Sequence, residues 1–386
     1  MNPSIHLEPS ATIKINSLAL EKQKSGQGVF NLSAGEPMVD TSDIVKQSAI
    51  RALQKNYTHY PPVAGIPELR ETACAWMNED FGANFTVSET LVTAGGKMGL
   101  YMVLQAYISL GDEVIIPAPY WVSYPSMVKI FGGVPKIIET SEAEDWKIQA
   151  TDVEALITPR TKFIMLNNAS NPTGVLYTRE ELHTILSIAQ THNVMVISDE
   201  VYSGLVYDGN EYISCASFPE FKNNVVIIQS CSKSFAMTGW RVGFVFAPQD
   251  VIKILSSLTG QTTSGVTTIS QYATLTAIEH RKTIVPAIRD AMQKRRDVFI
   301  DTFNSAFGTE LQKPVSALYS FIPMSAFGIS ETDSLTFCER VMEETCVALV
   351  PGVAFGKEGY VRVAFGVGEE ELRESIDMLS TFFIEI

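Results

Sequence analysis

Short apolar runs alternate with amphipathic stretches through the middle of the chain. The runs lie at residues 91–93, 113–117, 134–140, 162–168, 194–200, 225–230 and 241–248. Between them, residues 97–110, 121–131, 151–157 and 178–192 are typical of helices. Buried strands that alternate with helices at this spacing predict an α/β fold, with a mostly parallel, doubly wound sheet covered on both faces.

The pattern changes toward both ends of the chain. Helices are predicted near the N-terminus at 10–24 and 43–55, the first with a Ser or Thr cap. Beyond Pro286, helical stretches at about 286–305, 332–346 and 369–384 flank short strands such as 317–324 and 360–366. We therefore expect a large domain over residues 40–280 and a smaller α+β domain formed by residues 1–39 and 281–386.

A single lysine follows the apolar run at 225–230. Lys233 lies just past the carboxyl end of a predicted strand, which is where ligands bind in open α/β sheets. Desolvation lowers the pKa of a lysine, so such an amine can attack a carbonyl carbon. Ser230 and Arg241 offer a hydroxyl and a planar cation that suit a phosphate. The alternative is an exposed loop lysine beside a surface arginine.

Other predicted strands also end in polar or aromatic residues. Gly96 and Lys97 open a helix whose N-terminus suits an anion, although paired glycines also occur in simple turns. Trp121 either covers a flat ring or belongs to the core, and the second case is commoner. Asn171 begins a proline–glycine turn. Asp199 follows a buried run, so it needs a cation, and a protonated ring nitrogen would serve.

These side chains together match one cofactor. Pyridoxal phosphate has an aldehyde that an amine can attack and a ring nitrogen that a carboxylate can hold. It also has a flat ring that an aromatic side chain can cover, and a phosphate that the serine, the arginine and the helix amides can bind. The sequence therefore predicts a site for that cofactor at the edge of the sheet.

Composition limits the other classes of function. The 386 residues include 29 Lys and Arg against 43 Asp and Glu, a net charge of −14, which argues against nucleic-acid or anionic-membrane partners. Five cysteines without a CxxC pair favour a reducing, cytoplasmic location, and the five histidines have no metal-ligand spacing, so no metal is expected. No secretory signal and no apolar run near ~18 residues is found, so no membrane span is expected.

The motifs also resemble those of a known family. They run from PSAT near residue 9 through GEP, YPPVAGIPELR, GGK, PYWVSYP, NPTG, SDEVY, SKSFAMTGWRVG and VPG to YVRV. The chain resembles the class I, fold type I pyridoxal-phosphate aminotransferases. More narrowly, PYWVSYP and FAMTGWR resemble the bacterial aspartate aminotransferases, a subgroup that includes aspartate/prephenate enzymes.

The resemblance implies a role in cofactor binding for several of these residues. Lys233 would form the imine with the cofactor and then move the substrate proton, and Asp199 would hold the ring nitrogen. Asn171 and Tyr202 would bond the phenolic oxygen, and Trp121 would stack on the ring. The phosphate would be surrounded by Gly96, Lys97, Ser230 and Arg241, the first two through backbone amides.

The resemblance also implies how substrate binds and how subunits pair. Arg362 would hold the substrate α-carboxylate in a pocket lined by Gly35 and bordered by Trp121 and Asn171. Lys97 would receive the distal carboxylate of an acidic substrate, whereas the alternative is a solvent-facing lysine. Tyr60 lies in a rigid proline-rich loop and is either a surface aromatic or a ligand-directed hydroxyl. The resemblance would direct it to the phosphate of the neighbouring subunit, giving a homodimer with shared sites.

We therefore expect an aminotransferase that moves the amino group between aspartate or glutamate and 2-oxoglutarate or oxaloacetate by a ping-pong mechanism. Two departures from the family pattern lie near the substrate end, VSALY at 315–319 in place of SGAFY and Ala364 in place of a serine. These departures could shift the substrate preference toward aromatic or prephenate-like acceptors.

Two rivals remain. The aminotransferase-like half of a transcription regulator would need a DNA-binding segment, and the stretch before Gly35 is too short and not basic enough. A pyridoxal-phosphate lyase or synthase could share the same fold.

Overall fold

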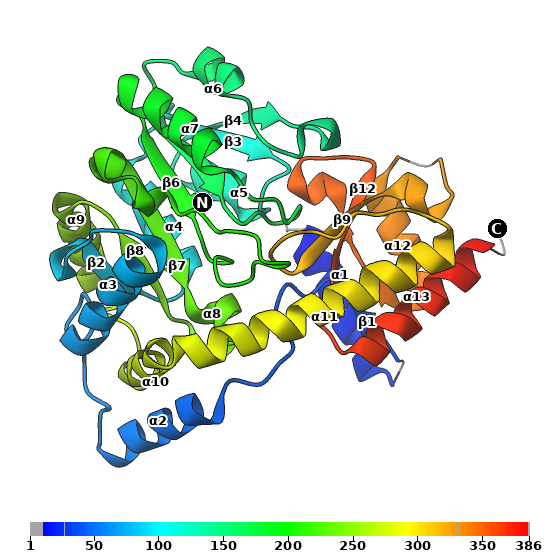
Figure 1. The fold of residues 1–386 in the computed structure, drawn as a ribbon, viewed down its shortest axis with the longest axis horizontal. Helices are drawn as coiled ribbons and strands as arrows, with labels where there is room; N and C mark the ends of the chain where they lie inside the picture. The colour runs from blue at the N-terminus through cyan, green and yellow to red at the C-terminus, as the bar shows by residue number, and fades with distance from the viewer. Residues whose placement is uncertain (1–10, 27, 331, 385–386) are drawn as a thin grey trace, which may run out of the picture.

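The computed structural model describes residues 11–26, 28–330 and 332–384. Its largest feature is a seven-stranded sheet in the order β2-β8-β7-β6-β5-β3-β4 (Figure 1). The strands are β2 (Thr90–Thr93), β3 (Glu113–Ala118), β4 (Val134–Glu139), β5 (Thr161–Asn167), β6 (Met195–Asp199), β7 (Val225–Ser230) and β8 (Gly243–Phe246). Neighbours from β4 to β7 pair in parallel, whereas β8 is antiparallel to β7 and β2. The predicted α/β class with a mostly parallel sheet is confirmed.

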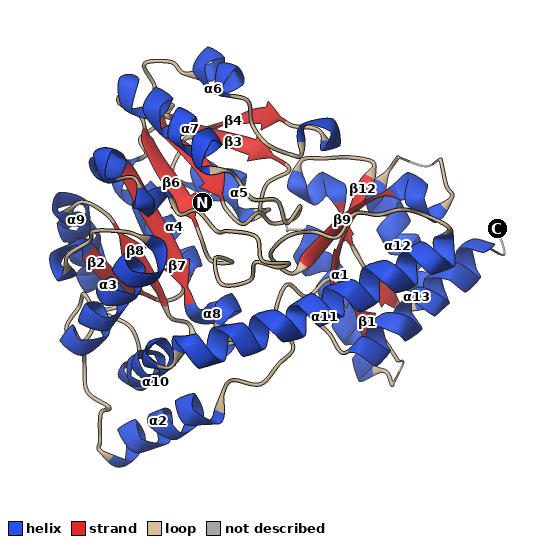
Figure 2. Ribbon diagram, in the orientation of Figure 1, coloured by secondary structure: helices blue, strands red, loops and turns tan. Residues whose placement is uncertain are grey.

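Helices cover both faces of this sheet (Figure 2). Successive strand residues point to opposite faces, so Val226 and Ile228 of β7 join one apolar cluster, while Val225 and Ile227 join the other. One cluster includes side chains of α4 (Gly96–Tyr107), α5 (Ser123–Ile130) and α9 (Gln249–Thr262). The other includes α3 (Pro67–Phe81), α6 (Ala150–Leu156), α7 (Arg179–Thr191) and α10 (Thr268–Glu279). Burial on both faces explains why these strands are almost wholly apolar.

A second, smaller sheet lies beside the first. It has the antiparallel order β11-β12-β9, formed by β11 (Val350–Pro351), β12 (Tyr360–Ala364) and β9 (Tyr319–Pro323). Near it, β1 (Phe30–Asn31) pairs in parallel with β10 (Val347–Ala348). The helices of this part are α1 (Ala11–Lys24), α12 (Ser334–Thr345) and α13 (Glu369–Ile384). Across the described residues, every helix is too short or too polar to cross a lipid bilayer.

One long helix links the two parts. In Figure 1, α11 (Arg281–Phe307) runs from α10 past α8 (Cys231–Ser234) to α13. The predicted start at 286 is wrong, because Pro286 lies inside the helix rather than in its first turn. The helix predicted at 121–131 is shorter, Ser123–Ile130, and α2 (Asp43–Gln54) closely matches its prediction. Pro9 and Ser10 of the PSAT motif, the latter a candidate helix cap, lie outside the described residues.

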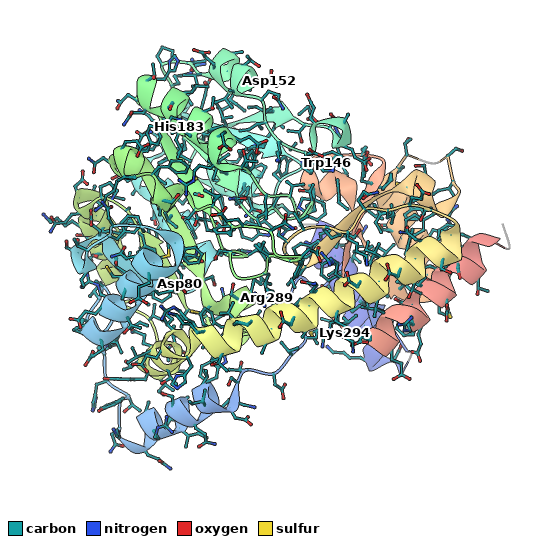
Figure 3. The ribbon with its side chains drawn as sticks, in the orientation of Figure 1. Asp80, Trp146, Asp152, His183, Arg289 and Lys294 are labelled. Carbon is teal, nitrogen blue, oxygen red and sulfur yellow. The ribbon has the colours of Figure 1, made fainter. Side chains whose placement is uncertain are left out.

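Aromatic side chains join the small sheet to the large one. Trp146, labelled in Figure 3, follows β4 and packs edge-on against Phe321 of β9 and Tyr360 of β12, at centroid distances of 5.6 and 5.1 Å. Nearby, Lys357 Nζ donates a hydrogen bond of 2.9 Å to the carbonyl of Thr140. These contacts hold β9 and β12 near the carboxyl ends of the large sheet's strands.

Candidate active site

A cavity of about 570 Å³ lies between the ends of the large-sheet strands and the small sheet. Its wall includes the last residues of β5, β6 and β7, the start of α4, and one residue each from β9 and β12. The predicted site residues that line it are Gly35, Gly96, Lys97, Trp121, Asn171, Asp199, Tyr202, Ser230, Lys233, Arg241 and Arg362. Residues spread over more than 300 positions of sequence are thus brought to one site.

Lys233 lies in α8, the single helical turn that follows β7. Its Nζ donates a hydrogen bond to the carbonyl of Gly35. Burial lowers the pKa of the amine to about 8; the carboxylate of Glu36 opposes this change, and neighbouring cations, Arg362 foremost, reinforce it. A larger share of the amine is therefore neutral near physiological pH than for an ordinary lysine, so it can act as a nucleophile or a base.

Glycines at the start of α4 bring backbone amides close to Arg241. Gly95 caps the helix with φ of +84°, and a Cβ there would lie 2.5 Å from Arg241 Nη2. A Cβ at Gly243 would lie 2.5 Å from the backbone nitrogen of Gly96. Ser230 lines the same cavity, and its Cβ lies 3.5 Å from where a Cβ at Gly96 would be. Free amides, a helix N-terminus and a guanidinium form a cradle for an anion.

Lys97 projects into the cavity from the first turn of α4. Its Nζ lies 4.7 Å from the ring centre of Trp121, so the ammonium rests over the indole. Burial lowers the pKa of Lys97, and the charge of Arg241 lowers it further. Cations held this close together favour the binding of a negatively charged ligand.

Asp199 ends β6 and is 4% exposed. The hydroxyl of Tyr124 donates a 2.8 Å hydrogen bond to its Oδ2, and the backbone nitrogen of Val201 donates to Oδ1 at 3.4 Å. Burial raises the pKa of the carboxyl to about 6, and the two hydrogen bonds oppose that rise. A buried carboxylate of this kind is stabilised by a cationic group bound beside it.

Arg362 of β12 is 4% exposed and stacks over the ring of Tyr319, with 4.3 Å between the guanidinium carbon and the ring centre. Nη2 donates to the carbonyl of Ser33 at 2.7 Å, and Nη1 to Asn171 Oδ1 at 3.3 Å. Nε has no hydrogen-bond partner among the described residues. A buried guanidinium with an unused donor suits a carboxylate ligand.

Sequence reasoning missed several residues of this cavity. Among them are Glu36, Asn167, Tyr124, Ser232 and Tyr319. Asn167 Nδ2 donates to the carbonyl of Asp199 at 3.0 Å, and Tyr319 shares a 2.7 Å hydrogen bond with Tyr202. Tyr124 lies three residues after Trp121, but nothing in the sequence connects it with Asp199. Nothing in the sequence connects Tyr319 with Tyr202.

Tyr60 does not line this cavity. It lies between α2 and α3 and is 90% exposed. The described chain therefore gives its hydroxyl no role within the same molecule.

The departures from the family pattern also lie outside the cavity. Ser316 Oγ donates a 2.7 Å hydrogen bond to the carbonyl of Gly174, while Leu318 and Ala364 are fully buried. The influence of Ser316 on substrate choice would be indirect, through the turn that carries Asn171.

Comparisons with known proteins agree along the whole chain. Residues 27–379 match the family model described as aminotransferase class I and II. A probable aspartate/prephenate aminotransferase of Aquifex aeolicus is 38% identical over 99% of this chain and 98% of its own length. An aspartate aminotransferase of Geobacillus stearothermophilus is 38% identical over 97% of this chain and 96% of its own length.

A solved structure agrees as well. That of aspartate aminotransferase from Thermus thermophilus with maleate superposes with a TM-score of 0.92 at 38% identity, covering 97% of both chains. The extent of the match and the cavity geometry lead to one conclusion: this chain belongs to the class I and II aminotransferase family and is an enzyme of that family.

Proposed function

We propose that the enzyme uses pyridoxal phosphate, because each part of the cavity fits one part of that molecule. The crowded glycine turn beside Arg241 leaves backbone amides open to a phosphate. Asp199 is a buried carboxylate with two hydrogen-bond donors and a raised pKa, which suits a cationic ring nitrogen. Lys233 has the lowered pKa that attack on an aldehyde requires. The meeting of these three features in one cavity carries the proposal.

Each side chain then has a defined task. When bound, the cofactor supplies an aldehyde carbon that accepts amines and a ring that withdraws electrons from the substrate α-carbon. Lys233 would take the proton from the substrate α-carbon and deliver a proton to the carbon that the cofactor supplies, and Asp199 would keep a proton on the ring nitrogen. Arg362 binds the α-carboxylate, with Gly35 lining that pocket. Tyr202 donates to the phenolic oxygen, a role it shares with Asn171.

The remaining residues fix orientation. Trp121 covers one ring face, and Asn171 borders both cofactor and substrate. Gly96 and Lys97 offer backbone amides to the phosphate, together with the side chains of Ser230 and Arg241. Because one cavity serves both the amino donor and the oxo-acid acceptor, ping-pong kinetics follow.

We propose aspartate and glutamate as donors, with oxaloacetate and 2-oxoglutarate as their acceptors. The support is the ammonium of Lys97, which rests over Trp121 inside the cavity and forms no ion pair with a carboxylate among the described residues. A solved relative was crystallised with maleate, which is a four-carbon dicarboxylate. A cation at this position binds a distal carboxylate by a charge-assisted hydrogen bond.

The test is a donor and acceptor panel. Aspartate with 2-oxoglutarate should give oxaloacetate and glutamate in equal amounts. Relatives named aspartate/prephenate aminotransferase make prephenate and aromatic donors the second candidates, so both belong in the panel. Release of ammonia or sulfide without glutamate would instead identify a lyase and refute the proposal.

Lys97→Ala is expected to reduce kcat/KM for aspartate about 10- to 150-fold. This corresponds to a loss of roughly 1.5–3 kcal/mol in transition-state binding, the scale of a hydrogen bond to a charged group. The value for phenylalanine should be almost unchanged, because no distal carboxylate is lost. Lys97→Met keeps the aliphatic stem against Trp121 and should reproduce the loss if charge is the cause. Equal losses for both substrates would contradict acid specificity.

We also propose a homodimer with shared active sites. Apolar side chains of α2 and the loop after it are exposed, including Ile50, Leu53 and Tyr57 at 43, 50 and 37%. Tyr60 extends from the same region at 90% exposure. A second copy that covers this surface would bury these side chains and could receive the hydroxyl of Tyr60 at its phosphate cradle.

Tyr60→Phe is expected to weaken cofactor affinity by roughly 10- to 100-fold, because one hydrogen bond to a charged phosphate is removed. Fluorescence titration of the apoenzyme measures the affinity, and sedimentation measures the subunit number. Tyr57→Phe is the matched control, since Tyr57 stacks on Tyr272 at 4.5 Å within one chain and has no proposed ligand. A monomer, or unchanged affinity in Tyr60→Phe, would refute shared sites.

Two further expectations complete the proposal. The large domain would span residues 40–280, and residues 1–39 and 281–386 would form the small one, which agrees with the pairing of β1 with β10. A cytoplasmic location is supported by the five free cysteines.

A further inference from the structure

Tyr319 is part of the cavity wall, and the sequence motifs give it no task. It begins β9, is 1% exposed, and lines the cavity with its ring and hydroxyl. In the antiparallel pair of β12 and β9, Arg362 is opposite Phe321, so Tyr319 is its diagonal neighbour on the same face. This register explains how Tyr319 comes to lie under the guanidinium.

The ring of Tyr319 supports Arg362 from one side. The guanidinium carbon lies 4.3 Å from the centre of this ring and 5.1 Å from that of Phe355. Two aromatic faces and the hydrogen bonds to Ser33 and Asn171 fix the guanidinium before a carboxylate binds. Such fixed placement reduces the ordering cost of binding.

The hydroxyl of Tyr319 contacts the opposite half of the site. It lies 2.7 Å from the hydroxyl of Tyr202 and 3.4 Å from the carbonyl of Gly35. That carbonyl already accepts a hydrogen bond from Lys233 Nζ. A Cβ at position 35 would lie 2.5 Å from the Tyr319 oxygen, so the hydroxyl is held closely against this turn.

Counting hydrogens gives the pair a direction. Each phenol has one hydrogen, and under the proposed function that of Tyr202 points to the phenolic oxygen of the cofactor. The Tyr202 oxygen is then an acceptor, and Tyr319 donates its one hydrogen to it at 2.7 Å rather than to the Gly35 carbonyl, which lies farther away at 3.4 Å. A donor that itself accepts a hydrogen bond is polarised and becomes stronger.

We propose that Tyr319 is a positioning residue for both halves of the site, its hydroxyl orienting and polarising Tyr202 and its ring seating Arg362. The inference rests on the proposed function, because the donor role of Tyr202 requires a bound cofactor. The charged and titratable groups around Tyr319 are Tyr202, Arg362, Glu36 and Lys233.

Spectral titration tests the hydroxyl. The visible absorbance of the holoenzyme changes with pH as the proton shared between Lys233 and the cofactor is lost, and the pH midpoint of that change is the quantity measured. A hydrogen bond from Tyr202 to the phenolic oxygen stabilises the deprotonated form and so lowers this midpoint. Tyr202→Phe should therefore raise the midpoint, by about 1–2 pH units for a hydrogen bond to a charged group. Tyr319→Phe should raise it by roughly a fifth of that shift.

The double variant separates polarisation from a general structural effect. In a Tyr202→Phe background, Tyr319→Phe should produce no further shift, because its effect passes through Tyr202. The matched control is Tyr177→Phe, which removes another buried hydroxyl outside the cavity and should leave the midpoint unchanged. An unchanged midpoint in Tyr319→Phe, or an equal shift in both backgrounds, would overturn the inference.

Kinetics test the ring. Tyr319→Phe keeps the platform and should leave KM for aspartate within about threefold, whereas Tyr319→Leu should raise it roughly five- to thirtyfold by loss of the cation–π contact. Equal KM values for the two variants would overturn the seating role. A wild-type protein without a pH-dependent visible band would refute the proposed cofactor itself. If the wild type shows the band and Tyr202→Phe shifts its midpoint, but Tyr319→Phe does not, only this inference would be refuted.

Discussion

Replacing Lys233 by alanine is expected to lower kcat by on the order of 10⁴-fold, the upper range for loss of a proton-transferring group. The amine is the single basic side chain of α8, and its lowered pKa of about 8 fits proton removal near neutral pH. Single-turnover assays with aspartate measure the loss directly. Disappearance of the cofactor's pH-dependent visible band should accompany it.

Two further variants make this expectation specific. Lys233→Arg keeps a positive charge but cannot become neutral, so it should be as inactive as Lys233→Ala. Lys253→Ala removes an exposed lysine of α9 and should retain full activity. If Lys233→Arg kept more than about a tenth of wild-type kcat, a neutral amine would not be required and the proposed role would be wrong.

The residues that could be predicted are those delivered by the ends of strands. Asp199, Ser230 and Lys233 follow apolar runs, and parallel strands bring their carboxyl ends to one edge. Gly96 was predicted because paired glycines precede an amphipathic helix. For these positions, local pattern and sheet topology together are enough to predict where the side chain lies.

Residues that depend on packing between distant segments could not be predicted. Tyr124 reaches Asp199 across 75 positions, and Tyr319 reaches Tyr202 across 117, so their contacts exist only once the elements pack together. The role of Tyr60 could not be predicted for a related reason, because its proposed partner belongs to a second chain.

Within the correctly predicted fold class, single helices were missed or misplaced, as α10 and α11 show. α10 contacts α2, α3 and α11, so side chains on several of its faces are buried and amphipathic periodicity is weak. Pro286 suggested a helix start, yet α11 begins before it and continues through it, and the helix packs against α10, α8 and α13. Tertiary contacts thus overrode the local signal in both cases.

Asp199→Asn is expected to lower kcat by roughly 150- to 5,000-fold, because a buried charge partner for the ring nitrogen is removed at a cost of roughly 3–5 kcal/mol. The hydroxyl of Tyr124 can still donate to the amide oxygen, so the geometry of the site should be kept. The kinetic loss should therefore appear with little change in the fold.

The same substitution should make the cofactor-free protein more stable. Burial raises the pKa of Asp199 from 3.8 to about 6, so the folded apoprotein favours the protonated carboxyl. The protonated carboxyl adds nothing unfavourable to the free energy of unfolding below pH 3.8. As pH rises through 6 the folded protein must ionise the buried carboxyl, and at pH 7 this lowers the free energy of unfolding by roughly 3 kcal/mol. Asparagine cannot ionise, so Asp199→Asn removes that cost.

Thermal melting with and without cofactor measures both effects. The apo variant should melt above apo wild type at pH 7, and the difference should vanish near pH 4. Addition of pyridoxal phosphate should raise the melting temperature of wild type more than that of the variant, because only the carboxylate gains a charged partner. An apo variant less stable than wild type at pH 7 would show that Asp199 is not strained by its burial, and the proposed ring-nitrogen contact would lose its main support.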